Sequence, residues 1–288
     1  MNLFKSIQEL RTHLYQQRLQ DRSVALVPTM GALHRGHMSL IERARKEADI
    51  VAVSIFVNPA QFNNSEDLAK YPRTLETDAS LCEAAGVNIL FAPDAEEIYP
   101  GGLGQAISSA GVSRVTPSAC SKGLCGKTRP GHFEGVTTVV SILFNIFQPD
   151  IAVFGEKDYQ QLKVIEAMVR ELHFQVGIVG APLVRDADGL ALSSRNERLS
   201  AAERGRALNI PRALLAAKEN FDSGVRDAGE LVKQVSALLT AEKEISIDYV
   251  EVVDCDSLEP LNKISTNAQL LVAAFVGKVR LIDNIRLG

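Results

Sequence analysis

Two histidines three residues apart, His34 and His37, lie in the segment PTMGALHRGH (residues 28–37), which follows an apolar run at 24–27. A glycine-containing turn that leads into a helix favours negative charge, because unpaired backbone N–H groups and the helix dipole both face it. The imidazoles can donate hydrogen bonds to phosphate oxygens, and Gly36 leaves room for a ligand close to the backbone. A metal site would need further ligands, such as the glutamate of a HExxH helix, and none is nearby. We therefore expect a phosphate-binding turn, with a pair of ordinary polar residues as the alternative.

A second polar segment, NPAQF (residues 58–62), follows the apolar run at 50–57. Its amides can bind a hydroxyl and a carboxylate together, because each amide offers a donor and an acceptor. Asn-Pro is also a common start of a plain turn. The segment by itself does not separate a substrate pocket from a turn.

A third polar segment, GEKDYQQ (residues 155–161), follows the apolar run at 151–154. Lys157 at a strand-to-helix turn suits a phosphate as a point charge. Asp158 could accept a hydroxyl or help to hold Mg²⁺, and its plain alternative is a helix N-cap. Gln161 lies one helical turn after Lys157, so both side chains can face one cleft.

A fourth polar segment, LSSRN (residues 192–196), offers two hydroxyls and a guanidinium, which together could clamp a polyphosphate. The alternative is a solvated loop before a helix near Ser200. Arg129 and His132 lie in another polar turn, to which the residues alone assign no role. Cys120 and Cys125 form a C-x4-C pair without a second pair or a histidine cluster, so we expect no metal site there.

The elements that must position these groups alternate along the first part of the chain. Apolar runs typical of fully buried strands occur at 24–27, 50–57, 87–91, 151–154 and 176–179, and helical patterns occur at 38–48, 75–85 and 159–172. This alternation predicts a parallel sheet covered by helices, in which ligands bind at the carboxyl ends of the strands.

The pattern changes near Pro182, where a smaller α+β domain is expected to begin. Helices are predicted at 200–219 and 226–241, followed by strands at 248–253, 269–276 and 278–285 without long helices between them. The stretch at 101–129 is rich in Gly, Ser and Thr and predicts a long loop.

Bulk composition narrows the class of protein. The 288 residues are 46% hydrophobic and 23% charged, as in soluble globular enzymes, and the net charge of −4 argues against nucleic acid as a partner. The chain has neither the apolar core of a signal peptide nor a stretch that approaches a membrane span. Four cysteines in so long a chain do not make a disulfide framework. We therefore expect a reduced, cytoplasmic protein without a membrane partner.

Taken together, these segments resemble the pantothenate synthetase (pantoate–β-alanine ligase) family over nearly the whole chain. PTMGALHRGH resembles that family's version of the HIGH nucleotide motif, and LSSRN resembles the KMSKS-type loop of the same nucleotidyl transferase superfamily. SIFVNPAQF, YPRT, RPGHFEGV, VFGEKDYQQL and DGLALSSRN occur in the family's order. HxGH alone occurs in many nucleotidyl transferases, whereas the ordered set is specific. One departure is Cys125, which stands where family members often have Glu.

The resemblance implies a fold and a reaction. A Rossmann-like parallel sheet domain that binds ATP and pantoate is expected over residues 1–182, followed by a smaller α+β lid domain over 183–288. The implied reaction condenses (R)-pantoate with β-alanine and ATP, giving pantothenate, AMP and pyrophosphate. The pantoate carboxylate attacks the α-phosphorus of ATP, and the β-alanine amine then displaces AMP from pantoyl adenylate. The resemblance also implies Mg²⁺ that travels with ATP, and a homodimer.

The resemblance further assigns roles to residues. His37 is expected to donate a proton to the leaving phosphate with His34 beside it, and Lys157 and Arg195 are expected to offset polyphosphate charge. Gln61 and Gln161 are expected to hold pantoate, and Gln61 also β-alanine. No resident metal ligands are expected. The residues expected to bind ATP are Met30, Gly31, Ala32, Leu33, His34, Arg35, Gly36, His37, Gly155, Glu156, Lys157, Asp158, Val184, Leu192, Ser193, Ser194 and Arg195.

Two other functions share part of this pattern. A nucleotidylyl transferase that passes AMP or CMP to a phosphate-bearing acceptor would also use HxGH and a basic clamp. Against it, Gln61 and Gln161 supply amides where an arginine cluster would bind such a phosphate. A nucleotide-binding regulator without turnover is the third reading, and the presence of both histidines with Lys157 and Arg195 argues against it.

Overall fold

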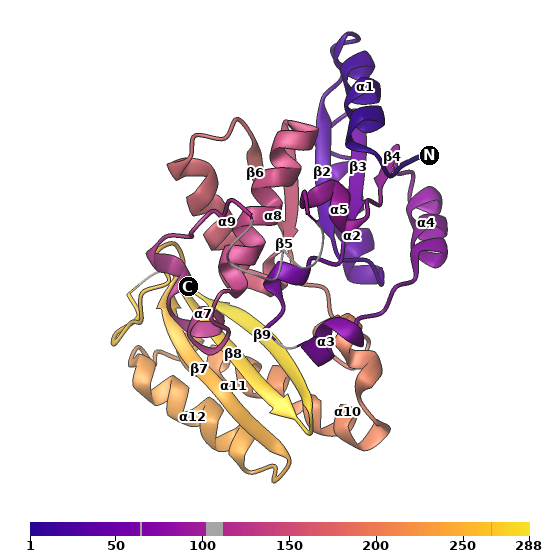
Figure 1. Cartoon of the computed structure of the whole chain (residues 1–288). Helices are drawn as coiled ribbons and strands as arrows, with labels where there is room; N and C mark the ends of the chain where they lie inside the picture. The colour runs from indigo at the N-terminus through magenta and orange to yellow at the C-terminus, as the bar shows by residue number, and fades with distance from the viewer. Residues whose placement is uncertain (64, 102–111, 266) are drawn as a thin grey trace. The chain divides into compact units, whose positions relative to one another are not determined.

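The computed structural model describes residues 1–63, 65–101, 112–265 and 267–288 (Figure 1). The chain divides into two compact units. The N-terminal unit comprises Met1–Ala119, Arg129–Glu156 and Val164–Ala181, and the C-terminal unit comprises Cys120–Thr128, Lys157–Lys163 and Pro182–Gly288. The domain assignments expected from the sequence, with their ligand-binding roles, stay predictions.

The N-terminal unit is built on a parallel six-stranded sheet. Its strands are β1 (Asn2–Phe4), β2 (Val24–Thr29), β3 (Ile50–Ile55), β4 (Ile89–Phe91), β5 (Ile151–Gly155) and β6 (Gly177–Ala181), in the order β1-β4-β3-β2-β5-β6. The five long apolar runs therefore became strands, and the prediction of a Rossmann-like parallel sheet is confirmed. The strand that the patterns did not predict, β1, has only three residues and is largely exposed, so it carries no apolar run.

Helices cover both faces of this sheet. The longer ones are α1 (Ile7–Arg18), α2 (Arg35–Ala44), α4 (Leu75–Ala84), α8 (His132–Phe147) and α9 (Tyr159–Glu171), and the shorter ones are η1 (Pro59–Gln61), α3 (Ser65–Ala69) and α5 (Ala95–Ile98). The core on one face joins Val27 and Val53 of the sheet with Ile41 of α2. On the opposite face, Phe91 contacts Phe147 of α8 with the rings edge to face, 5.6 Å between centroids.

Helix α8 was not among the helices predicted from the sequence. Most of its 16 residues are buried, including polar ones such as Thr137 and Ser141. A helix that is buried all round lacks the alternation of apolar and polar faces from which helices are predicted. No helix was predicted over this stretch.

The strand order places the polar turns side by side. β2 pairs with β3 on one side and with β5 on the other, so the order reverses between β2 and β5. Leu26 is level with Ala152, and three residues later along each parallel strand come Thr29 and Gly155. The turns after β2 and β5 therefore leave the sheet at one edge, at the kind of switch point where α/β proteins bind ligands.

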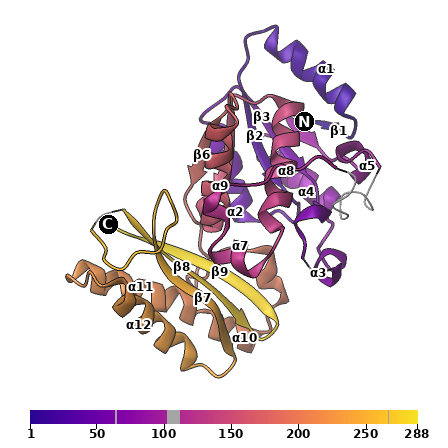
Figure 2. The same cartoon turned by 60° about the vertical axis from the view of Figure 1, so that its left-hand side comes forward.

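The C-terminal unit has an antiparallel sheet of β7 (Ile245–Asp254), β8 (Ala268–Val276) and β9 (Val279–Leu287), in that order. Helices α11 (Asn209–Asp222) and α12 (Ala228–Thr240) lie along one face of it, as Figures 1 and 2 both show. A second cluster on this sheet joins Val253 and Leu271 with Leu124 of the short helix α7 (Leu124–Thr128). The predicted smaller α+β domain is confirmed as a fold.

The single helix predicted at 200–219 is two helices, α10 (Ala201–Ala207) and α11, with Leu208 between them. Pro211 explains the break. Proline has no N–H to donate, and it is tolerated within the first turn of a helix but not in an interior. A new helix therefore starts just ahead of Pro211.

Part of the predicted loop at 101–129 lies outside the described residues. Its described portion contains two short helical turns, η2 (Ala119–Ser121) and α7.

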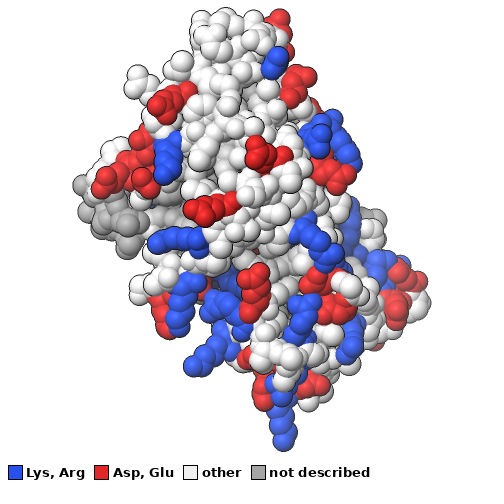
Figure 3. Space-filling model, turned by 90° about the vertical axis from the view of Figure 1, so that its right-hand side faces the viewer, with Lys and Arg blue, Asp and Glu red and all other residues white. Residues whose placement is uncertain are grey.

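Basic and acidic side chains are interspersed on the face shown in Figure 3. Across the described ranges, no helix is long and apolar enough to cross a membrane.

Candidate active site

The turn that follows β2 has an unusual backbone that is held by a buried carboxylate. Gly31 and Ala32 both have positive φ angles, 81° and 50°. Asp78 of α4 is 1% exposed and accepts the backbone N–H groups of Ala32 at 3.0 Å and Leu33 at 2.8 Å. A Cβ atom on Gly31 would lie 3.0 Å from the Asp78 carboxylate. Asp78 thus fixes the path by which the chain reaches His34.

The two histidines are built into the start of helix α2. The N–H of Gly36 donates to Nδ1 of His34 at 3.1 Å, and the N–H of His34 donates to Nδ1 of His37 at 3.2 Å. Because Nδ1 of each ring accepts a hydrogen bond, the proton of each neutral imidazole sits on Nε2. The rings lie 4.1 Å apart, centroid to centroid. The arrangement supplies a pair of Nε2–H donors at a helix N-terminus, where anions are favoured.

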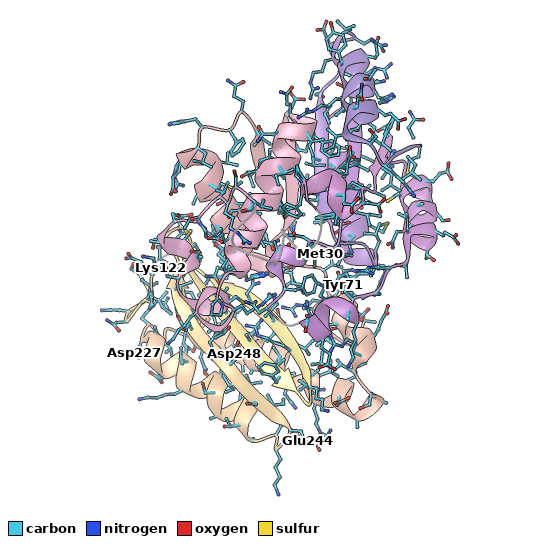
Figure 4. All side chains as sticks on the ribbon, in the orientation of Figure 1. Met30, Tyr71, Lys122, Asp227, Glu244 and Asp248 are labelled. Atoms are coloured by element: carbon cyan, nitrogen blue, oxygen red, sulfur yellow. The ribbon has the colours of Figure 1, made fainter. Side chains whose placement is uncertain are left out.

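Gln61 follows β3 and is held on both its side chain and its backbone. Its Oε1 accepts a hydrogen bond from Asn58 at 3.0 Å, and its Nε2 lies 3.1 Å from Sδ of Met30. Figure 4 labels Met30 where the chain leaves β2. The backbone oxygen of Gln61 accepts from Nδ1 of His132 at 2.8 Å and from Arg129 at 3.4 Å. The polar turn at 129–132, which had no assigned role, therefore supports Gln61.

The end of β5 leads directly into Lys157. Gly155 ends the strand, and the 3₁₀ turn η3 (Glu156–Asp158) follows. The ammonium of Lys157 lies 3.4 Å from Oδ2 of Asp158, and its side chain is 19% exposed. Asp158 therefore carries at least this ion pair, and α9 begins at the next residue.

Within the C-terminal unit, Asn284 of β9 holds the backbone of Lys157. Its Nδ2 donates to the Lys157 carbonyl at 3.0 Å, and its Oδ1 accepts from Gln269 of β8 at 2.6 Å. The neighbouring Asp283 accepts two hydrogen bonds from Arg185, at 2.7 and 2.9 Å. Burial raises the pKa of Asp283, and the Arg185 guanidinium opposes that rise. The antiparallel sheet thus anchors the lysine turn through buried amides.

The predicted polyphosphate clamp begins a short 3₁₀ helix, η4 (Ser194–Arg198). Oγ of Ser193 accepts the N–H of Arg195 at 3.2 Å, which caps that helix. The N–H of Leu192 donates to the carbonyl of Val184 at 3.0 Å, so these two predicted nucleotide contacts are neighbours. The segment is a short helical turn ahead of α10, and its role as a polyphosphate clamp stays a prediction.

Cys125, which stands where the resemblance suggested a carboxylate, is buried on α7. Its Sγ lies 3.2 Å from the hydroxyl of Tyr249 and 3.4 Å from Arg280. Arg280 in turn donates to Asp248, labelled in Figure 4, at 2.7 and 3.0 Å. Burial raises the pKa of Tyr249 well above its usual value, and Cys125 adds to the rise. This network ties α7 to the antiparallel sheet.

The predicted site residues divide between the two units. Met30 to His37, Gln61, Gly155 and Glu156 belong to the N-terminal unit. Lys157, Asp158, Gln161, Val184 and residues 192–195 belong to the C-terminal unit. Within the first group, the structure brings Met30 against Gln61 and places both histidines on one helix start. Their roles stay predictions.

Sequence reasoning missed the residues that hold these groups in place. Asp78 is 46 positions from Ala32, and Asn284 is 127 positions from Lys157. Such long-range contacts have no spacing signature in a single sequence. Within the described part of the chain, no cluster of His, Cys, Asp and Glu could hold a metal ion.

Comparison with known proteins gives a consistent result. A family model described as pantoate-beta-alanine ligase matches residues 2–286. The chain is 48% identical to the pantothenate synthetase of Moorella thermoacetica over 287 residues, covering 100% of this chain and 99% of that protein. It is also 48% identical to the pantothenate synthetase of Sulfurihydrogenibium sp. over 278 residues, 96% of each.

Solved structures agree with the sequence relatives. The pantothenate synthetase from Thermus thermophilus superposes with a TM-score of 0.91 at 44% identity, covering 100% of this chain and 99% of that one. A pantoate-beta-alanine ligase from Francisella tularensis, complexed with beta-gamma ATP and beta-alanine, gives a TM-score of 0.80 at 34% identity, covering 99% of this chain and 97% of that one.

Proposed function

The chain belongs to the pantoate–β-alanine ligase family, and on that premise we propose that it joins (R)-pantoate to β-alanine with ATP, releasing AMP and pyrophosphate. The observation that carries the site assignment is the pair of imidazoles at the start of α2. Nδ1 of each ring accepts a backbone N–H, so each ring has its proton on Nε2. A phosphate that receives charge in the transition state needs such donors.

The first step forms an acyl adenylate. A carboxylate oxygen of pantoate attacks the α-phosphorus of ATP, and the bond from that phosphorus to the bridging oxygen of pyrophosphate breaks. Because each neutral imidazole has its only N–H at Nε2, His37 and His34 stabilise the departing pyrophosphate as hydrogen-bond donors and keep that proton. The backbone from Met30 to Arg35 lines the same phosphates.

Cationic and hydroxyl groups of the C-terminal unit offset the polyphosphate charge in this proposal. Lys157 and Arg195 supply positive charge, and Ser193 and Ser194 supply hydrogen bonds. Gly155, Glu156, Asp158, Val184 and Leu192 border the nucleoside. Mg²⁺ fits as an ion carried by the phosphates, because magnesium in nucleotide sites keeps waters and phosphate oxygens as ligands.

The second step forms the amide bond. The amine of β-alanine attacks the carbonyl carbon of pantoyl adenylate, the tetrahedral intermediate loses AMP, and the nitrogen loses a proton. Gln61 and Gln161 hold pantoate, and Gln61 also contacts β-alanine. No serine or cysteine nucleophile is required, since adenylation already supplies a good leaving group. The protein positions the reactants and keeps water from the adenylate.

Pantoate-dependent exchange between ATP and labelled pyrophosphate tests this mechanism. Exchange is expected when pantoate is present and β-alanine is absent, because only the first, reversible step is then running. Active protein without exchange would overturn the adenylate mechanism. AMP release that needs all three substrates separates the ligase from a nucleotide-binding regulator.

The competing nucleotidylyl transferase is tested in the same assay. Exchange that required a phosphate-bearing acceptor in place of pantoate would favour it. The amide of Gln61, whose nitrogen lies beside Met30, supports a hydroxy acid instead, since a phosphate dianion is usually met by arginine or lysine.

We also propose a cytoplasmic homodimer. The dimer is proposed from the family resemblance. Light scattering after size exclusion should give twice the mass of one chain. The four cysteines are free thiols, which suits a reducing compartment. The role of residues 183–288 as a lid stays a prediction.

A further inference from the structure

Tyr99 is a buried tyrosine that contacts Asn58, the hydrogen-bond partner of the Gln61 amide, and it has no role in the proposed chemistry. Tyr99 follows the short helix α5 and is 1% exposed. Its hydroxyl lies 2.8 Å from Oδ1 of Asn58. Burial raises the pKa of the Tyr99 phenol above its usual range, against a lowering by Arg114, so the hydroxyl keeps its proton. Because Oδ1 of an amide only accepts, Tyr99 is the donor in this bond.

The amide of Asn58 is fixed in one orientation by four partners. Its Oδ1 accepts from Tyr99 and from the backbone N–H of Ala60 at 3.3 Å. Its Nδ2 donates to the carbonyl of Gly135 at 3.1 Å and to Oε1 of Gln61 at 3.0 Å. A flipped amide would set an NH₂ group against the Ala60 N–H and an oxygen against the Gly135 carbonyl. Backbone groups cannot exchange donor and acceptor roles, so the flip is excluded.

The orientation of Asn58 is passed on to Gln61. Since Oε1 of Gln61 takes the N–H of Asn58, its Nε2 must point the other way, where it lies 3.1 Å from Sδ of Met30. An amide nitrogen carries two hydrogens, and the thioether is a weak acceptor for one of them. The side of Gln61 turned away from Asn58 is therefore purely a hydrogen-bond donor.

The backbone of Gln61 is held equally closely. A Cβ atom on Gly135 would lie 2.4 Å from the carbonyl oxygen of Ala60, so only glycine lets helix α8 approach η1 this closely. That approach is what brings the Gly135 carbonyl within reach of Asn58. His132, three residues earlier on α8, must carry its proton on Nδ1, because the carbonyl oxygen of Gln61 can only accept a hydrogen bond.

We propose that Tyr99 is a positioning residue which, through Asn58, sets the amide of Gln61 as an N–H donor toward an oxygen acceptor of the hydroxy-acid substrate. This inference rests on the proposed function, in which Gln61 binds pantoate. It makes Gln61 more selective than a free amide. A substrate group that accepts hydrogen bonds, such as a carboxylate or hydroxyl oxygen, is recognised there, and a group that can only donate is rejected.

Tyr99→Phe removes the hydroxyl and keeps the ring. The KM for pantoate in the exchange assay should rise about three- to tenfold, the weight of one buried hydrogen bond, while the KM for ATP changes less than about twofold. Tyr249→Phe is the matched control. It also removes a phenol hydroxyl, from a partly buried tyrosine that contacts Cys125 in the C-terminal unit, and should leave the KM for pantoate unchanged.

A double-mutant cycle separates this role from a merely structural one. Gln61→Met keeps the length of the side chain and removes its donor. If Tyr99 acts through Gln61, Tyr99→Phe should have no further effect on the KM for pantoate in the Gln61→Met background. Equal effects of Tyr99→Phe in the two backgrounds would overturn the proposal, as would an unchanged KM in a stably folded Tyr99→Phe protein.

Gln61→Glu tests the amide orientation without disturbing the buried tyrosine, and it decides the question if Tyr99→Phe does not fold. Glutamate still accepts the hydrogen bond of Asn58 and turns an oxygen toward the substrate. The KM for pantoate should rise at least as much as in Gln61→Met. Retained pantoate affinity in Gln61→Glu would show the opposite orientation. Wild-type protein without exchange would contradict the proposed function itself, which is a separate outcome.

Discussion

The histidine turn after β2 and the lysine turn after β5 are each held in place by a buried side chain that bonds to the backbone. The side chain is a hydrogen-bond acceptor at the first turn and a donor at the second. In the first, a buried acceptor, Asp78, takes backbone N–H groups, and the functional rings themselves complete the helix start. In the second, buried Asn284 donates a hydrogen bond to the backbone carbonyl of Lys157. The Lys157 ammonium is at the end of a flexible side chain, beside Asp158.

This difference matches the role that each group has in the proposed mechanism. A hydrogen-bond donor to a developing charge works only when its hydrogen points at one oxygen, so its ring needs a fixed rotamer. A point charge acts over a wider range of positions, and an ammonium can reach a phosphate from several directions. We therefore expect small errors of geometry to be costly at the histidine turn and tolerated at the lysine turn.

The largest effect is expected for His37→Ala, which removes an aimed donor. The rate of adenylation should fall about 10²- to 10³-fold, as when one hydrogen-bond donor to a developing negative charge is removed. The free energy of unfolding should fall by only about 1 kcal/mol, because the helix start loses one hydrogen bond. Pyrophosphate exchange assays and urea unfolding measure the two quantities. His13→Ala, on α1, is the control, and near-normal activity of His37→Ala would refute its role as a hydrogen-bond donor to the leaving phosphate.

Asp78→Asn should come next, because it loosens the histidine turn without touching either ring. Asparagine would set an NH₂ group against one of the two backbone N–H groups that Asp78 accepts. We expect kcat/KM for ATP to fall about 10- to 100-fold. Asp150→Asn is the matched control, since Asp150 also accepts a backbone N–H, from Val24 at the other end of β2, at 2.7 Å.

If Asp150→Asn slowed the reaction as much as Asp78→Asn, the loss would reflect general destabilisation rather than the shape of the turn. Unfolding free energies of both variants, measured with urea, should fall by similar amounts of about 1–3 kcal/mol. Only the rate constants should separate them.

Asn284→Ala applies the same test to the lysine turn, where a smaller effect is expected. The Lys157 carbonyl loses its donor, but the ammonium can still reach the phosphates by rotating about its stem. The value of kcat/KM for ATP should fall about two- to fivefold. Asn88→Ala, which removes a side-chain acceptor for the Val51 N–H, is the control. A fall in kcat/KM as large as that of Asp78→Asn would show that the lysine turn tolerates errors of geometry no better than the histidine turn.

The smallest effect concerns stability at high pH, again near the histidine turn. Burial raises the pKa of the Cys82 thiol on α4 from 9.0 to about 12, and the Asp78 charge adds to the rise. The folded state therefore holds the thiol proton more tightly than the unfolded state. This contribution to stability is fully present below pH 9.0 and is lost as the pH rises toward about 12. Urea unfolding at about pH 8 and about pH 10.5 should show a steeper loss in the wild type than in Cys82→Ala, and equal losses would contradict it.

The predictable parts of this molecule are those with local signatures. Apolar runs marked the buried strands, and the polar segments at their ends mark the candidate site, because parallel strands present their carboxyl ends together. Helix α8 escaped because it is buried on all sides, and β1 because it is short and exposed. Asp78, Tyr99 and Asn284 escaped because each acts on a residue far away along the chain, and only the folded chain brings them together.

His34 has two functions in this proposal, and a mutation could remove one of them without the other. It caps helix α2 through Nδ1, and in the proposed mechanism its Nε2–H donates to the ATP phosphates. Asparagine, a favoured N-cap residue, could take over the first function and not the second. A gene copy with that single change would keep its fold while its chemistry weakened. A single substitution at this position could therefore convert the enzyme into a nucleotide-binding protein with weakened catalysis, and the free energy of unfolding would change little.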